Sequence, residues 1–94
     1  MAERLIEREY VIAGRVQMVM FRDFAKRKAR ELGIRGFVRN NEDGTVVVVA
    51  QAERDKLDEL AKQLKKGPVF AKVESVGIIE KETRQKFKNF LIIY

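Results

Sequence analysis

Two stretches of helical periodicity, each set between runs of β-prone residues, constrain the fold of this chain most strongly. Apolar residues recur at intervals of three and four over residues 21–32 and again from Leu57 to Leu64, as they do on one face of a helix. Residues 8–14, 34–40, 45–50 and 70–80 are rich in β-branched and aromatic side chains, and a shorter run follows at 87–94, which is typical of strands. The order β-α-β-β-α-β predicts a ferredoxin-like α+β sandwich, with two helices on one face of an antiparallel sheet and a short C-terminal strand in addition.

Turn residues separate these elements. Gly33 is expected to end the first helix, and Gly67-Pro68 is expected to end the second. Asp43-Gly44 lies between two β-prone runs and predicts a tight hairpin. The chain has 94 residues, a length that suits one hydrophobic core, so we expect a single domain over residues 1–94.

Composition limits the chemistry that this chain can perform. It contains no cysteine and no histidine, which excludes disulfides, thiol nucleophiles, Cys/His zinc sites and histidine general bases. No loop carries the alternating acidic ligands of a Ca²⁺ or Mg²⁺ site, so we expect no metal. The formal net charge of +6 favours anionic ligands such as phosphates or nucleic acid, although solvated helix faces also account for such a charge.

The sequence predicts a protein of the cytoplasm. No apolar run reaches the roughly 18 residues of a membrane-spanning helix. The first ten residues, MAERLIEREY, are charged and hold no apolar stretch of the kind found in secretory signals. We therefore expect a cytoplasmic protein without membrane contact.

The predicted topology brings Arg22 and Asn40 to one edge of the sheet. A strand, a crossover helix and a second strand give two parallel strands, so the loop after Gly14 and the end of the second strand lie at the same edge. With the third strand between them, the two parallel strands lie about 10 Å apart. Arg22 at the start of the first helix and Asn40 at the end of the second strand could then reach one small ligand.

A bound anion would explain why an arginine lies at a helix N-terminus. That end carries about half a positive charge, its free backbone N–H groups form an anion cradle, and a guanidinium adds bidentate hydrogen bonds. Three simpler explanations stay open. Arg22 could be solvated or paired with Asp23, and Asn40 could bond its local backbone, a role that suits its neighbour Asn41 well.

The stretch GRVQMVMFRDFAKRKARELGIRGFVRNNEDGTV resembles the signature of the acylphosphatase family. That signature has a GRVQGVxFR loop, a helix end with A-x-x-LG, a G-[FW]-V-[RK]-N strand and a DG[ST]V hairpin. The later segment KKGPVFAKVESV is similar to the family's GPxxAxVxxV pattern, so the resemblance extends from about Tyr10 to Val76. It implies a ferredoxin-like fold and hydrolysis of the carboxyl-phosphate bond of acyl phosphates, giving a carboxylate and inorganic phosphate without metal or cofactor.

The resemblance also implies roles for individual residues. Arg22 matches the family arginine that binds the phosphate, and Asn40 matches the asparagine that orients the attacking water. The phosphate is implied to bind backbone amides of the preceding loop as well, roughly those of Gln17, Met18, Val19, Met20 and Phe21. The implied partners are a small-molecule acyl phosphate as substrate and inorganic phosphate as product and competitor.

Met18 departs from the family pattern, which has glycine between Gln17 and Val19. If the position requires a positive φ, methionine adds about 1–2 kcal/mol of strain, and if the ligand passes close by, the side chain crowds it. A non-catalytic domain that binds an anion is therefore an alternative to an enzyme. Met18 and Met20 could instead pack against the sheet edge or the helix, and the family tolerates variation at Met20.

Two further features concern the periphery of the sheet. Gln51 and Ala52 stand where relatives often have Glu-Gly, and we expect this difference to affect only the turn into the second helix. The short C-terminal strand could protect a sheet edge or pair with another molecule. We expect the protein to be a monomer.

A ferredoxin-like RNA-binding module is a further alternative, because both the fold and the positive charge suit it. Such modules stack bases on aromatic residues of the first and third strands. Here the third strand carries only valines over residues 46–49, and the first offers only Tyr10, expected on one face with Ile12. The sequence therefore argues against nucleic acid as a partner. The basic residues of the first helix are expected on its solvated face: Lys26, Arg27, Lys28 and Arg30.

Overall fold

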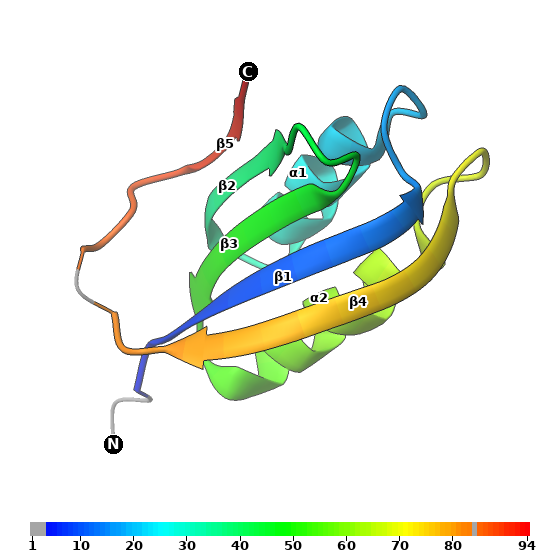
Figure 1. Cartoon of the computed structure of the whole chain (residues 1–94). Coiled ribbons are helices and arrows are strands. Elements are labelled where there is room, and N and C mark those ends of the chain that lie inside the picture. The colour runs from blue at the N-terminus through cyan, green and yellow to red at the C-terminus, as the bar shows by residue number, and fades with distance from the viewer. Residues whose placement is uncertain (1–3, 84) are drawn as a thin grey trace.

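The computed structural model describes residues 4–83 and 85–94 (Figure 1). These residues form seven elements: β1 (Ile6–Arg15), α1 (Phe21–Glu31), β2 (Arg35–Asn40), β3 (Val46–Ala52), α2 (Arg54–Lys66), β4 (Lys72–Lys81) and β5 (Phe90–Ile93). The predicted order of elements is confirmed, and only the bounds differ, by a few residues. Neither helix of the described part is long and apolar enough to cross a membrane.

The strands form one sheet in the order β4-β1-β3-β2-β5, and both helices lie against the same face of it, behind the sheet in Figure 1. β3 lies between β1 and β2, as predicted, and the pairs β1–β4, β1–β3 and β2–β3 are antiparallel. β5 runs parallel to β2, so the sheet is mixed rather than antiparallel throughout. The chain crosses from the β4 edge to the β2 edge and enters β5 beside the start of β2, which makes the two strands parallel.

The core lies between the helices and the sheet. Its side chains alternate along the strands and recur at helical spacing on α1 and α2, and all are buried: Tyr10, Ile12, Phe21, Ala25, Ala29, Val38, Val46, Val48, Leu57, Leu60 and Leu64. Tyr10 shares the helix-side face with Ile12, as predicted, and its hydroxyl donates to the carbonyl oxygen of Leu57 at 2.7 Å. A base therefore cannot stack on Tyr10.

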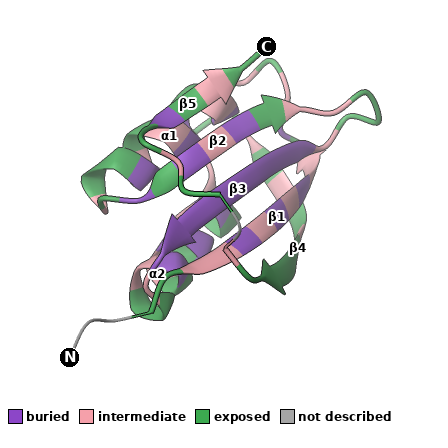
Figure 2. Ribbon diagram, turned by 90° about the vertical axis from the view of Figure 1, so that its left-hand side faces the viewer, coloured by how far each residue is buried: buried purple, intermediate pink, exposed green. Residues whose placement is uncertain are grey.

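β3 is buried along its whole length, as the continuous purple strand of Figure 2 shows. Residues 85–89 cross the face of the sheet that the helices leave open. Gln51 holds this segment, since its side-chain oxygen accepts a hydrogen bond from the Phe87 amide at 3.0 Å and its side-chain nitrogen donates to the Gln85 carbonyl. The expectation that Gln51-Ala52 affects only the turn into the second helix is wrong, because both residues belong to β3 and Gln51 anchors the crossing segment.

α1 and β2 hold β5 in place. The guanidinium of Arg30 donates two hydrogen bonds to the carbonyl oxygen of Phe90, at 3.0 and 3.2 Å. The amide of Gly36 donates to the carbonyl oxygen of Asn89 at 2.9 Å. Arg30 is exposed, as predicted for the solvated face of this helix, and these hydrogen bonds give it a structural role as well.

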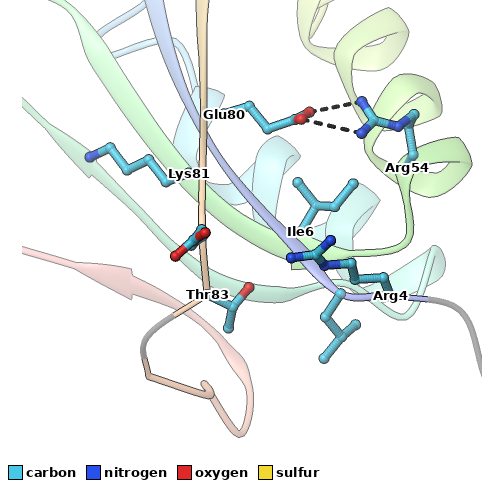
Figure 3. A pocket seen from close by; sticks show the side chains of 8 residues that line it. Arg4, Ile6, Arg54, Glu80, Lys81 and Thr83 are labelled. Carbon is cyan, nitrogen blue, oxygen red and sulfur yellow. Dashed lines mark hydrogen bonds and ion pairs between the residues drawn. The ribbon is translucent and has the colours of Figure 1, made fainter.

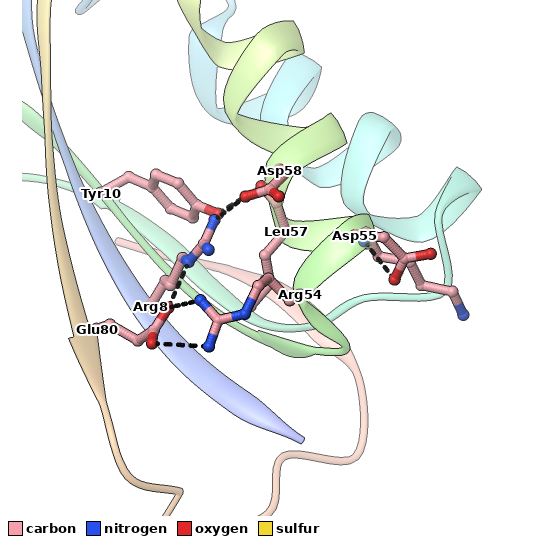
Figure 4. Close-up of polar contacts among 8 residues, drawn as sticks. Arg8, Tyr10, Arg54, Asp55, Leu57, Asp58 and Glu80 are labelled. Carbon is pink, nitrogen blue, oxygen red and sulfur yellow. Dashed lines mark hydrogen bonds and ion pairs between the residues drawn. The ribbon is translucent and has the colours of Figure 1, made fainter. Parts of the chain in front are cut away.

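An ion-pair network fastens β1 and β4 to α2 (Figure 4). The Arg8 side chain is 9% exposed and bonds Asp58 at 2.7 Å and Glu80 at 3.1 Å. Arg54 donates to both carboxylate oxygens of Glu80, at 3.0 and 3.3 Å. Burial alone would lower the pKa of Arg8, but its interactions with Asp58, Tyr10 and Glu80 outweigh this effect, so the pKa of Arg8 lies above its ordinary value.

We expect this network to weaken in acid. Hydrogen bonds from Arg8 and Arg54 hold the pKa of Glu80 below its ordinary value of 4.5. A lowered folded-state pKa stabilises the fold above the unfolded-state pKa, and this stabilisation is lost as the pH falls through the folded-state value. The free energy of unfolding, measured with urea from pH 7 downward, should therefore fall more steeply for the native protein than for Glu80→Gln once the pH drops below about 4.5.

Glu74→Gln is the matched control, because Glu74 lies on the same strand and forms no ion pair with the residues that the structure describes. Its pH profile should parallel that of the native protein. Parallel profiles for Glu80→Gln and the native protein would contradict a role of Glu80 in acid sensitivity.

Candidate active site

A cleft of about 430 Å³ lies at the end of the sheet where the loop after β1 and the last residues of β2 were predicted to meet, and both Arg22 and Asn40 line it. Val46 pairs with Ile12 of β1 on one side and with Asn40 of β2 on the other, which sets the ends of these strands level. The loop after β1 and the end of β5 form the remaining walls. The full lining is Val16, Met18, Met20, Phe21, Arg22, Asp23, Asn40, Ile92 and Tyr94.

Core anchors fix both ends of the loop between β1 and α1. Val16 and Phe21 are each 1% exposed, and Val19 packs against the core between them. The side-chain nitrogen of Gln17 donates to the carbonyl oxygens of Asn41 at 2.8 Å and Thr45 at 2.9 Å. The loop is therefore tied to the β2–β3 hairpin and cannot shift independently of Asn40.

Met18 and Met20 project outward from this anchored loop. Their φ angles are 60° and 65°, in the left-handed region that costs a non-glycine residue about 1–2 kcal/mol. The positive φ suspected at Met18 is confirmed, and Met20 shares it, which the sequence had not suggested. The alternative that both methionines pack against the sheet or helix is wrong, since they are 99% and 70% exposed. Apolar burial therefore does not explain the strain.

The backbone amides of residues 17–23 have no protein acceptor among the described residues. The first amide of this region to form a hydrogen bond is that of Phe24, which donates to the Met20 carbonyl at 3.0 Å. No side chain caps the helix N-terminus at Met20. Left-handed residues in such a turn bend the chain so that successive N–H groups form a concave anion site, and the helix dipole adds positive potential there.

Arg22 lies in the first turn of α1 and is half-buried. It forms no ion pair with Asp23 or with any other carboxylate of the described residues. Its guanidinium carbon lies 4.9 Å from the centre of the Tyr94 ring. Stacking occupies the face of a guanidinium and leaves its N–H edge able to bind an anion. Pairing with Asp23, one of the simpler explanations for Arg22, is thus wrong.

Asn40 and Asn41 differ in how their side chains are used. Asn41 accepts a hydrogen bond from Arg39 and donates to the Thr45 hydroxyl at 3.0 Å, the local turn role that was predicted for it. The side-chain oxygen of Asn40 is buried and accepts no hydrogen bond from the described residues. A buried acceptor without a donor costs about 1–3 kcal/mol of folding free energy. Its position next to the cleft therefore favours a bound group that donates a hydrogen bond to it.

Ile92 and Tyr94 are site residues that sequence reasoning missed. They line the cleft because β5 runs parallel to β2, which brings the end of β5 level with Asn40. The sequence placed the C-terminal strand only at a sheet edge or at a contact with another molecule. A parallel pairing between two strands so far apart in the sequence has no local signal, so only the three-dimensional structure reveals this wall.

A second cleft of about 490 Å³ lies at the other end of β1 (Figure 3). Arg4, Arg54 and Lys81 line it, but so do Glu80 and Glu82, and Glu80 already binds Arg54. An anion would meet two carboxylates there. Thr83 also lines it, with a buried hydroxyl that has no partner among the described residues. No cluster suited to hold a metal ion occurs in residues 4–83 and 85–94. The candidate active site is therefore the cleft of Arg22 and Asn40.

Fold and cleft together place the chain among small α+β sandwiches in which a helix N-terminus and an arginine line one cleft. Comparison with known proteins narrows this class. The acylphosphatase family model matches residues 8–92. An acylphosphatase of Koribacter versatilis is 41% identical over 92 residues, which cover 98% of this chain and 84% of the relative. An acylphosphatase of Archaeoglobus fulgidus is 39% identical over 90 residues, covering 96% of this chain and 100% of the relative.

Solved structures agree with this assignment. The crystal structure of acylphosphatase from Bacillus subtilis superposes with a TM-score of 0.92 at 29% identity, over 95% of this chain and 99% of that one. The chain belongs to the acylphosphatase family. It is an enzyme of this type, which hydrolyses acyl phosphates, so the enzymatic interpretation holds over the non-catalytic and RNA-binding alternatives.

Proposed function

We propose that Arg22 and the loop amides of Gln17, Met18, Val19, Met20 and Phe21 bind the phosphate group of an acyl phosphate, and that Asn40 orients the water that attacks it. The observation that carries this proposal is the buried side-chain oxygen of Asn40, which has no donor among the described residues and lines the same cleft as Arg22. This oxygen lacks a hydrogen-bond donor, and the O–H group of a water molecule would supply one.

Arg22 and the amides suit a phosphate for different reasons. The guanidinium provides a flat pair of N–H donors that matches two phosphate oxygens. The amides at the start of α1 are fixed donors in an anchored loop, so they stabilise negative charge without reorganising. Both supports strengthen as charge builds up on the phosphate oxygens during transfer.

The reaction then needs no ionisable base from the protein. The oriented water attacks phosphorus, and the bond between phosphorus and the acyl oxygen breaks. The acyl group leaves as a carboxylate, which is stable without a proton, and a phosphate oxygen takes the proton of the water. Orientation and charge stabilisation supply the acceleration, which is consistent with a chain that has no histidine or cysteine.

Replacement of Asn40 tests the water-orienting role. Asn40→Ala should lower kcat for acetyl phosphate by about a hundredfold or more, because one transition-state contact of this kind is worth about 10²–10³ in rate. Inhibition by inorganic phosphate should change little, since Arg22 and the amides remain. Steady-state kinetics with phosphate as competitor measure both quantities.

Asn41→Ala is the matched control. The Asn41 side chain serves only the turn, whereas its backbone carbonyl binds Gln17, so the change should leave kcat within a few-fold. Normal turnover in Asn40→Ala would remove Asn40 from the mechanism. Loss of phosphate inhibition in Asn40→Ala would instead make it a phosphate ligand.

The remaining features of this proposal concern the protein as a whole. Residues 1–94 act as one domain, as a monomer in the cytoplasm. The substrate is a small acyl phosphate, with inorganic phosphate as product and competitor and without nucleic acid or membrane as a partner. The pairing of β2 with the four-residue β5 supports the monomer, because it leaves a very short strand at that edge of the sheet, and short edge strands pair poorly with a second copy.

A further inference from the structure

Three large, exposed side chains gather at the mouth of the candidate active site. Met18 is 99% exposed, Met20 70% and Tyr94 95%, and all three line the cleft that holds Arg22 and Asn40. Single exposed apolar residues are ordinary on a protein surface. Several exposed apolar residues around one cleft are typical of a binding surface. We term this group of three residues the apolar rim.

The apolar rim is built independently from two parts of the chain. The strained loop turns Met18 and Met20 outward while Val16 and Phe21 enter the core. Tyr94 reaches the cleft from the end of β5 and stacks on Arg22. The cleft is thus polar beside Arg22 and Asn40 and apolar where it opens to solvent. Its volume of about 430 Å³ falls within the range of small-molecule sites, about 300–1,000 Å³.

We infer that the apolar rim binds the acyl group of the substrate and favours acyl phosphates whose acyl group is aromatic or otherwise apolar. This inference rests on the proposed function, since a phosphate held by Arg22 and the loop amides directs its acyl group toward the cleft mouth. Methionine thioethers are flexible and polarisable, and they make favourable contacts with aromatic rings. The Tyr94 ring offers a further aromatic surface.

The charge of the cleft agrees with a neutral acyl group. Asp23 lines the cleft as well and is exposed, so a second carboxylate or phosphate on the acyl group would meet a like charge. A small acyl group such as acetyl would leave most of the apolar rim in water. The cleft therefore discriminates among acyl phosphates by the charge and the size of the acyl group.

The test compares benzoyl phosphate with acetyl phosphate. For each substrate, kcat/KM is divided by the rate of uncatalysed hydrolysis, which removes the difference in intrinsic reactivity, and the ratio of the two values gives the acyl selectivity. Met18→Asn and Met20→Asn are suitable variants, because asparagine tolerates the left-handed conformation. Any effect of either change on the loop amides acts on both substrates alike and cancels in the ratio.

Each single variant should lower the preference for benzoyl phosphate about five- to tenfold, the effect of losing an apolar side chain that the bound acyl group would partly bury, and the double variant should lower it further. Ile79→Asn makes the same kind of change at an exposed residue of β4 outside the cleft and should leave the selectivity unchanged. Affinity for two unreactive ligands, benzylphosphonate and methylphosphonate, should shift in the same way.

A double variant that keeps the selectivity of the native protein within twofold would overturn the inference. The proposed function has its own separate test, because Arg22→Ala should abolish turnover of acetyl phosphate as well as of benzoyl phosphate. Unchanged selectivity together with an inactive Arg22→Ala would reject the apolar rim alone. An active Arg22→Ala would reject the phosphate site on which both proposals depend.

Discussion

Arg22→Ala is expected to lower kcat/KM for acetyl phosphate by about a thousandfold or more, in line with the 10³–10⁵ that an arginine contributes to phosphoryl transfer. The substitution removes the one guanidinium among the residues that line the cleft. This guanidinium has no carboxylate partner among the described residues, and it lies beside the free amides at the start of α1. Inhibition by inorganic phosphate should weaken in parallel, because substrate and product share this contact. Steady-state kinetics and phosphate inhibition constants measure both effects.

Two controls separate the contact from the charge. Arg27→Ala removes an exposed arginine from the same helix and should change kcat/KM only a few-fold, through the general attraction of a basic protein for anions. Arg22→Lys keeps the charge but loses the planar fork and should remain strongly impaired. Equal activity of Arg22→Ala and Arg27→Ala would show that only net charge matters and would remove Arg22 from the site.

The largest expected effect on stability comes from Gly36→Ala. Gly36 has a φ of +148°, and a Cβ atom there would overlap the carbonyl oxygen of Val49 and lie 2.8 Å from its carbonyl carbon. That carbonyl belongs to β3, the central strand, and cannot move without breaking the β2–β3 pairing. We expect a loss of about 3 kcal/mol or more in the free energy of unfolding, measured by urea denaturation followed by circular dichroism.

Gly77→Ala provides the matched control. It makes the same change in another strand, where the closest contact of an added Cβ is the Val11 carbonyl oxygen at 3.9 Å, an ordinary van der Waals distance. The free energy of unfolding should change by no more than about 0.5 kcal/mol. If Gly36→Ala were as stable as Gly77→Ala, the crowding between β2 and β3 would have to be relieved by a backbone shift.

Local patterns were enough to predict much of the fold and the meeting of Arg22 with Asn40. Helical periodicity and β-prone runs are set by which side chains enter the core, so they can be read one segment at a time. The convergence of Arg22 and Asn40 followed from the handedness and spacing of a β-α-β unit. The different use of Asn40 and Asn41 could not be settled in this way, because it depends on which side chain the hairpin turns toward the cleft.

Features that depend on distant segments could not be predicted. No local pattern indicates that β5 pairs with β2 in parallel, or that Gln51 secures the crossing chain. The left-handed conformation of Met20 is likewise invisible in the sequence, since methionine has no preference for it. Tyr94 could not be placed in the cleft without knowing that β5 pairs with β2 in parallel.

The short β5 has a consequence for how the enzyme responds to heat. It is a four-residue strand at the edge of the sheet, and short edge strands open with less free energy than the core of a domain. Because Ile92 and Tyr94 belong to the cleft wall, opening of this one strand would remove part of the proposed active site while β1, β3 and both helices stay intact. Catalytic turnover should then fail on warming at temperatures where circular dichroism still reports a native protein.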